Sequence, residues 1–239
     1  MAFDLHEVST ADGGNLQTST ITGDDGPNSI LGTPEDDVLF GGGGNDTLTG
    51  AAGNDTLDGG AGGADMSIYS SNRSDYSIVI TASGFTVSGP DGNDTLSGIE
   101  RFHFSDTHLA FDLGSGQAAG NSVRIIGAAF DAPSIAAHPD WVTVGLNLFD
   151  SGMTMQQVCQ LVIGVMGNPT NEAFVTTVYQ NVVGSPPPPA EHEFFVGLLT
   201  GSGGRMTQAE LLEIAANADI NEQNIDLVGL QQTGVDYIH

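Results

Sequence analysis

The chain has 239 residues, enough for one or two domains with a substantial core. Lysine and arginine total 4 against 30 aspartates and glutamates, so the formal net charge is −26. Nucleic-acid binding needs clustered basic residues and an anionic membrane would repel this chain, so both partner classes are excluded. No apolar run is long enough to span a bilayer. The single Cys159 excludes an internal disulfide, and the start, MAFDLHEVST, predicts no N-terminal secretory signal.

The acidic residues are mostly aspartate, there is no lysine, and glycine is abundant at 34 residues. A solvated helix face would use glutamate, whereas aspartate with glycine is typical of turns. Turns rich in oxygen atoms bind hard cations. The composition therefore favours a cation-binding protein built on turns.

From Gly23 the sequence repeats every nine residues, as GDDGPNSIL, GTPEDDVLF, GGGGNDTLT, GAAGNDTLD and GGAGGADMS. Six residues of glycine-rich turn allow positive φ, and positions seven to nine predict a short strand with one core residue. Two turns and two strands complete one coil, so each turn stacks on its second neighbour. The sixth position reads Asn28, Asp37, Asp46 and Asp55, and the fifth block slips by one residue to Asp65; the eighth reads Ile30, Leu39, Leu48 and Leu57.

This pattern resembles the RTX, or hemolysin-type, calcium-binding repeat, G-G-x-G-x-D-x-U-x. GGGGNDTLT matches every fixed position, GAAGNDTLD lacks one glycine, and GTPEDDVLF lacks two. The alternative, a flexible linker, would not keep leucine at every ninth residue. The resemblance implies a short parallel β-roll with calcium as cofactor, and ions between turn 32 and turn 50 and between turn 41 and turn 59. The implied ligands are Asp37, Asp46, Asp55 and Asp65, with carbonyl oxygens of Gly43, Asn45, Ala52 and Asn54.

Residues 66–112 alternate between polar and apolar side chains and predict a β-hairpin region that turns at 82–84. The segment is similar to the strands that close the roll in serralysin-type proteases. GPDGNDTLS at 89–97 repeats the nonapeptide without stacked neighbours in the sequence, so we expect Asp94 to be a turn residue. His103 and His108 are five residues apart, which predicts opposite strand faces and a structural role.

The C-terminal half changes to a helical period after a linker, LGSGQAAG, at 113–120, which predicts domains at 1–113 and 114–239. Met155, Val158, Cys159 and Val162 follow helical spacing. Capping boxes are expected at Thr154–Gln157 and Thr207–Glu210, a third is a candidate at Asp219–Glu222, and SPPPPA at 185–190 separates two helices. WVTVGLNLFDSGMTMQQV aligns with FFVGLLTGSGGRMTQAEL, which predicts an all-α repeat domain. It resembles a helical domain of unknown function that follows RTX repeats.

Catalytic motifs are not found: His192-Glu193 lacks the second histidine of H-E-x-x-H, and there is no G-x-S-x-G elbow or P-loop. The leading hypothesis is a non-enzymatic, secreted, calcium-binding RTX protein that acts at the cell surface or outside the cell. Its expected partners are calcium ions, a type I secretion machinery, and an extracellular polysaccharide or surface protein. The alternatives are a C-terminal secretion and folding module of a longer passenger, and an enzyme with an unrecognised site.

Overall fold

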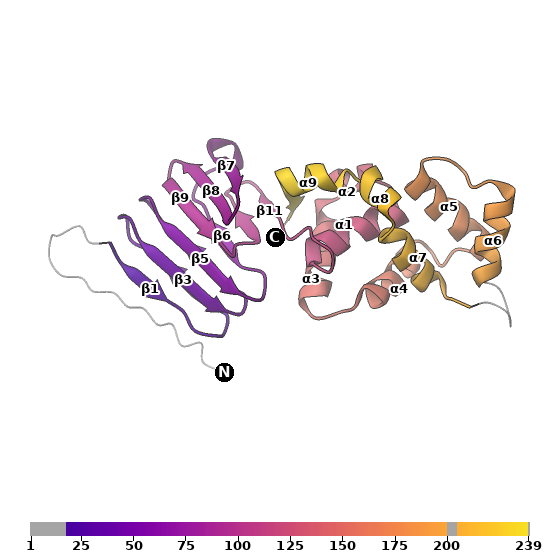
Figure 1. The fold of residues 1–239 in the computed structure, drawn as a ribbon, viewed down its shortest axis with the longest axis horizontal. Helices are drawn as coiled ribbons and strands as arrows, with labels where there is room; N and C mark the ends of the chain where they lie inside the picture. Colours follow the sequence, from indigo (N-terminus) through magenta and orange to yellow (C-terminus); the bar gives the residue numbers. More distant parts are fainter. Residues whose placement is uncertain (1–17, 200–204, 239) are drawn as a thin grey trace. The chain divides into compact units, whose positions relative to one another are not determined.

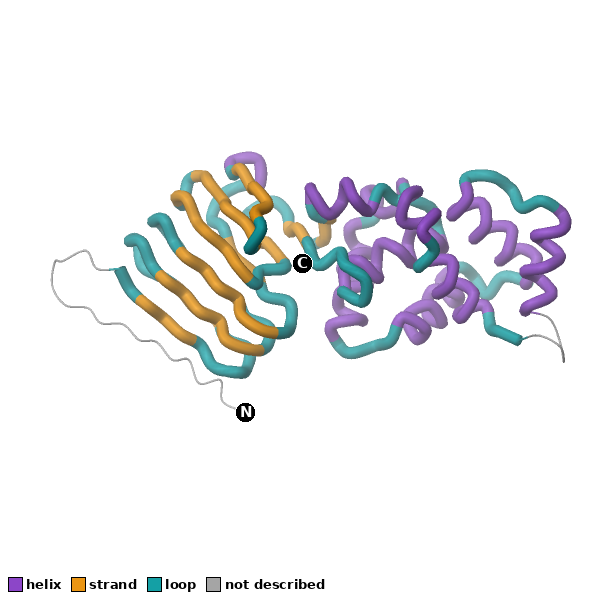
Figure 2. Tube along the Cα trace, in the orientation of Figure 1, coloured by secondary structure: helices purple, strands orange, loops and turns teal. Residues whose placement is uncertain are grey.

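The computed structural model describes residues 18–199 and 205–238, and the chain divides into two compact units, Met1–Ala110 and Phe111–His239. The first unit consists mainly of strands and the second mainly of helices (Figure 2). The predicted fold class, a short parallel roll with a hairpin region followed by a helical domain, is confirmed. One short strand, β12 (Val235–Tyr237), also lies in the helical unit. The MAFDLHEVST segment and the second glycine-rich turn at 200–204 lie outside the described residues.

Two sheets form the strand unit, and the repeats alternate between them (Figure 1). The first has the order β1 (Thr20–Thr22), β3 (Val38–Gly43), β5 (Thr56–Ala61), β9 (Gly92–Ser97), β8 (Gly84–Gly89), β7 (Ser77–Thr81). The second contains β2 (Ser29–Leu31), β4 (Thr47–Thr49), β6 (Met66–Ile68), β10 (Arg101–His103) and β11 (His108–Ala110). Strands β1, β3, β5 and β9 run parallel, as do β2, β4, β6 and β10.

The nine-residue period sets the register of both sheets. Leu39 is paired with Leu57 in one sheet, and Ile30 with Leu48 in the other, each across eighteen residues. Leu39 and Leu48 are 0% exposed and Leu57 is 1% exposed. The eighth position of each repeat therefore fills the space between the sheets, and burial of these side chains is the main apolar contribution to the roll.

The predicted hairpin is formed by β7 and β8, which run antiparallel with Ile80 opposite Phe85. A short 3-10 helix (Arg73–Asp75) precedes the hairpin, and buried aromatic side chains lie in the segment that follows the repeats. The rings of Tyr69 and Phe104 stack with centroids 5.5 Å apart, and those of Phe85 and Phe102 meet edge to face at 5.1 Å. These rings extend the leucine core where the nonapeptide repeat ends.

The helical unit contains α1 (Ala118–Ala129), α2 (Pro133–Ala137), α3 (Pro139–Asp150), α4 (Met155–Val165), α5 (Asn171–Val183), α6 (Pro189–Leu199), α7 (Gln208–Ala216), α8 (Asp219–Asn224) and α9 (Leu227–Thr233). The linker predicted at 113–120 is partly wrong, because α1 begins at Ala118. Leu113 is buried, and Oδ2 of Asp112 accepts a hydrogen bond from the Ala119 N–H over 3.1 Å. The acid satisfies a free donor at the start of the helix, so the segment is structured.

Both main capping boxes are present, at Thr154 with Gln157 and at Thr207 with Glu210. The third candidate is wrong: Asp219 is the first residue of α8 and not its cap, and no side chain caps this helix. The two aligned segments both form a helix followed by a capped helix, as α3 with α4 and α6 with α7. Helices α5 and α6 are separated by the proline run, as expected.

Candidate calcium-binding site

The sixth-position residues of alternate repeats are joined by hydrogen bonds along one side of the roll. The backbone N–H of Asp37 donates to Oδ1 of Asp55 over 2.8 Å, and that of Asp55 donates to Oδ1 of Asp94 over 3.0 Å. The Ser19 N–H donates to Oδ1 of Asp37 over 2.7 Å. One oxygen of each carboxylate therefore holds two stacked turns together through a charge-assisted hydrogen bond.

The opposite side of the roll has the same ladder. The N–H of Asn28 donates to Oδ1 of Asp46 over 2.8 Å, and the N–H of Asp46 donates to Oδ1 of Asp65 over 2.7 Å. The last step spans nineteen residues because residues 62–63, both glycines with φ near +85°, absorb the extra residue of the fifth repeat. Asp65 therefore occupies a sixth position, and its own N–H donates to Glu100.

The first glycine of each repeat lies against the sixth-position side chain. A Cβ atom on Gly41 would lie 2.4 Å from Oδ2 of Asp46 and 2.5 Å from the Gly59 carbonyl oxygen. A side chain at this position would displace both groups, so the site needs glycine. Oδ2 of Asp46 and the Gly59 carbonyl oxygen, which belongs to the next turn on the same side, therefore both lie beside Gly41.

The repeats differ in how the sixth-position side chain uses the oxygen that takes no part in the ladder. In the two degenerate repeats the side chain closes its own turn: Asp37 Oδ2 accepts hydrogen bonds from the N–H and hydroxyl of Thr33, and Asn28 Oδ1 accepts one from the Asp24 N–H. In the two better repeats, Oδ2 of Asp46 and Oδ2 of Asp55 are buried and have no hydrogen-bond partner. A buried carboxylate oxygen without a donor is costly, and a bound cation would satisfy it.

Burial is the main cause of pKa shifts along the ladders. Desolvation raises the pKa of Asp46 and of Asp55 above the usual range, although a backbone N–H donor opposes the shift in each. The pKa of Asp65 and that of Asp94 are raised to about 6, again chiefly by desolvation and also by neighbouring carboxylates. Keeping these four carboxyl groups ionised close to one another therefore costs free energy, and a bound divalent cation would lower that cost.

The predicted carbonyl ligands lie in the turns beside these acids. Gly43 ends β3, and its N–H donates to the Asp24 carbonyl over 2.9 Å. The carboxamides of Asn45 and Asn54 bond to neighbouring turns. Asn45 Oδ1 accepts from the Ala64 N–H, Asn54 Nδ2 donates to Oδ1 of Asp36, and Asn54 Oδ1 accepts from the Asn93 N–H. In residues 18–199 and 205–238, no hydrogen bond ends on the carbonyl oxygens of Asn45, Ala52 or Asn54. These oxygens are available for a cation.

The expectation that GPDGNDTLS stands apart from the repeats is wrong. Strand β9 pairs in parallel with β5, with Leu96 opposite Leu57, although 39 residues separate them. The Gly53 N–H donates to the Asp91 carbonyl over 2.9 Å, so the turns stack as well. Asp94, 2% exposed, is the next member of the first ladder rather than a residue of an isolated turn. After β6, residues 69–88 leave the repeat pattern and bring the chain back beside β5.

His103 and His108 were expected on opposite faces, and this is also wrong. They are directly opposite each other on the antiparallel strands β10 and β11, and their rings stack with centroids 4.1 Å apart. The alternation rule holds within one strand and does not carry across a turn. Among the described residues, no group of three or more His, Cys, Asp or Glu side chains could hold a metal by itself. A cation site in the turns therefore needs backbone carbonyl oxygens.

Comparison with known families agrees with this geometry. A family model for the RTX calcium-binding nonapeptide repeat (4 copies) matches residues 13–46 and 31–63. This segment of the chain therefore carries RTX repeats, and such repeats bind calcium. No curated protein matches the chain closely enough to indicate a relationship. In the described part of the chain, none of the helices has both the length and the apolar character needed to cross a membrane.

Proposed function

We propose that this chain is a secreted, non-enzymatic protein whose roll is completed by calcium and whose helical unit binds a partner outside the cell. The observation that carries the calcium part is the buried, unpartnered Oδ2 atom on Asp46 and on Asp55. These are the repeats closest to the RTX pattern, and the more degenerate repeats satisfy the same position with their own hydrogen bonds.

Asp46 and Asp55 would be the principal ligands, together with carbonyl oxygens of Gly43, Asn45, Ala52 and Asn54. Asp37 would act mainly through its ladder, since its Oδ2 already accepts hydrogen bonds from Thr33. Asp65 would likewise act mainly through its ladder, where its Oδ1 accepts the Asp46 N–H. Calcium would supply positive charge and an oxygen-binding coordination sphere. The chain's own residues supply the carboxylates, the stacked turns and the glycines that let backbone approach the site.

The proposed energetics suit a protein that folds after export. Extracellular calcium modules have dissociation constants of about 10⁻⁴–10⁻³ M. At roughly tenfold excess calcium, each site would add about 1.4 kcal/mol of stability. Without calcium, the buried acids and a net charge of −26 oppose the compact roll. We therefore propose that a type I secretion machinery exports the chain before calcium completes the fold.

The calcium part is tested by isothermal titration of the calcium-depleted protein. We expect binding in the stated range that is weakened by Asp46→Asn and by Asp55→Asn but not by Asp219→Asn, which removes the same charge from α8. Equal calcium affinity in all four proteins would show that the roll carboxylates are not the ligands.

Export is tested in the native host by locating the intact chain and a truncation after Pro189. We expect the intact chain in the medium and the truncation inside the cell. Recovery of the intact chain only from the cytosol would contradict secretion. Finding it only as the end of a longer product would favour the second candidate, a secretion and folding module.

A further inference from the structure

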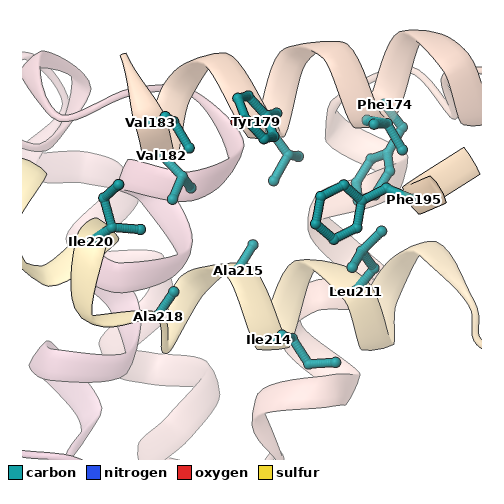
Figure 3. Close-up of a pocket in the computed structure, with 12 residues that line it drawn as sticks. Phe174, Tyr179, Val182, Val183, Phe195, Leu211, Ile214, Ala215, Ala218 and Ile220 are labelled. Carbon is teal, nitrogen blue, oxygen red and sulfur yellow. The ribbon is translucent and has the colours of Figure 1, made fainter. Parts of the chain in front are cut away.

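An apolar cavity in the helical unit has no role in the calcium chemistry. It has a volume of ≈ 200 Å³ and lies between α5, α6, α7 and α8. Figure 3 shows the side chains that line it. Carbon atoms of Phe174, Tyr179, Phe195, Leu211 and Ala215 line it. An apolar group that enters such a space leaves water, which is favourable.

The cavity continues into an exposed apolar rim. Val183, Ile214 and Ile220 line it and are 38%, 55% and 45% exposed. We call the cavity and these three side chains the α5–α8 groove. A small ligand inside the cavity would leave the rim in water, whereas a partner that lies along the groove would cover it. The shape therefore favours a macromolecular partner with several apolar anchors.

Helix α6 contributes one wall of the groove through Phe195. None of its residues is fully buried. Polar contacts join it to α5: the Tyr179 hydroxyl donates to Glu191 over 2.7 Å, and His192 Nε2 lies 3.2 Å from the Thr176 hydroxyl. Phe195, Val196 and Leu199 of α6 also pack against the core of the helical unit, and Phe195 lines the groove.

The four helices that line the groove are acidic, and Arg205 lies in the segment that precedes α7. The segments of α5, α6, α7 and α8 contain no lysine or arginine. Their acids are Glu172, Glu191, Glu193, Glu210, Glu213, Asp219 and Glu222, of which Glu222 pairs with the buried Arg124. An apolar groove with acidic surroundings is complementary to a helix that has apolar anchors on one face and basic residues beside them.

We propose that the α5–α8 groove binds the apolar face of a basic amphipathic helix from a partner protein. This inference rests on the proposed binding role of the helical unit and adds the chemical class of the partner. Leucine or aromatic side chains of the partner would enter between Phe195 and Ala215, while its lysines and arginines would face the surrounding carboxylates.

The test uses the full chain and a fluorescent leucine–lysine peptide with leucines at helical i, i+3, i+4, i+7 spacing. Anisotropy is measured at physiological salt, where non-specific attraction to a chain of charge −26 is screened. We expect saturable binding. The affinity should fall at least tenfold when serines replace the leucines of the peptide, and likewise when glutamates replace its lysines. Equal binding of the serine or glutamate peptide would overturn the proposal.

The groove itself is tested by Ala215→Phe, which fills the cavity without changing charge, and by Ile214→Gln at the exposed rim. Val144→Phe is the matched control, because Val144 is 57% exposed on α3 and does not line the groove. We expect at least tenfold weaker binding in the first two proteins and unchanged binding in the control. The Ile214 variant keeps the test valid if Ala215→Phe lowers the melting temperature.

Unchanged peptide affinity in Ile214→Gln would overturn the assignment of a basic partner helix. Self-association of the chain through the groove, abolished by Ala215→Phe, would overturn it as well. Calcium titration of the same samples reports on the roll separately. Loss of this inference with intact calcium binding would leave the calcium part of the proposed function standing.

Discussion

The backbone N–H of Asp37 donates a 2.8 Å hydrogen bond to Oδ1 of Asp55, eighteen residues further along the chain. The same carboxylate leaves Oδ2 buried without a partner. One oxygen therefore serves the stacking of turns, and the other is the candidate ligand. This division allows the two roles to be separated by substitution.

We expect Asp55→Asn to weaken calcium binding at least tenfold while leaving the calcium-free protein as stable as the parent or more so. The amide oxygen can still accept the Asp37 N–H, but the buried negative charge, whose pKa desolvation raises, is removed. Calorimetric titration and thermal melting measure the two effects. A variant that loses stability in chelator but binds calcium normally would reverse the assigned roles.

We expect Leu48→Ala to destabilise the roll by about 2–5 kcal/mol at saturating calcium, because the side chain is fully buried between the sheets. Leu31→Ala is the control: Leu31 is 67% exposed, and its loss should cost less than about 0.5 kcal/mol. Urea unfolding in calcium measures both. Equal losses for the two variants would mean that the eighth position is not the core.

Ala51 stands where the RTX pattern has glycine, and it adopts φ +77°. Because a left-handed conformation costs an L-residue about 1–2 kcal/mol, we expect Ala51→Gly to stabilise the roll by up to about 1 kcal/mol after the entropic cost of glycine. Urea unfolding checks this, with Ala61→Gly in β5 as the comparison. A destabilised Ala51→Gly protein would contradict the strained turn.

The calcium-free roll should become more stable as the pH falls from 7 to 5. Asp65 and Asp94 have a folded pKa of about 6, above that of the unfolded chain, so between about pH 4 and pH 6 the folded state binds more protons. With calcium, the stabilisation by the ion should shrink over the same range, because protons compete for the carboxylates. Thermal melting at both pH values measures this. A calcium-free protein that melts higher at pH 7 would contradict the buried acids.

The repeat register was predictable because it is local. A period of nine with leucine at the eighth position determines which strands pair, and the pairs Leu39–Leu57 and Ile30–Leu48 follow directly. The glycine and aspartate positions likewise predicted the turns. The pattern did not indicate that the Thr33 hydroxyl donates a hydrogen bond to Oδ2 of Asp37. That bond depends on a side chain at a position where the repeat departs from glycine.

The expectations that proved wrong depended on how separate segments of the chain meet in space. The 89–97 repeat stacks on β5 only after residues 69–88, which leave the repeat pattern, and no local spacing signals that return. His103 and His108 face each other because the chain reverses between them. The α5–α8 groove was not predictable either, because it depends on how α6 packs against α5 through Tyr179 and Glu191.

The most direct test of the account is hydrogen exchange of the full chain, followed by mass spectrometry, in calcium and after calcium depletion. We predict that calcium slows exchange in peptides covering residues 36–66, where the N–H groups of Asp37, Asp46 and Asp55 form the ladders. Peptides from α1, α4 and α5 should exchange equally in both conditions. Identical exchange of residues 36–66 with and without calcium would contradict a calcium-completed roll.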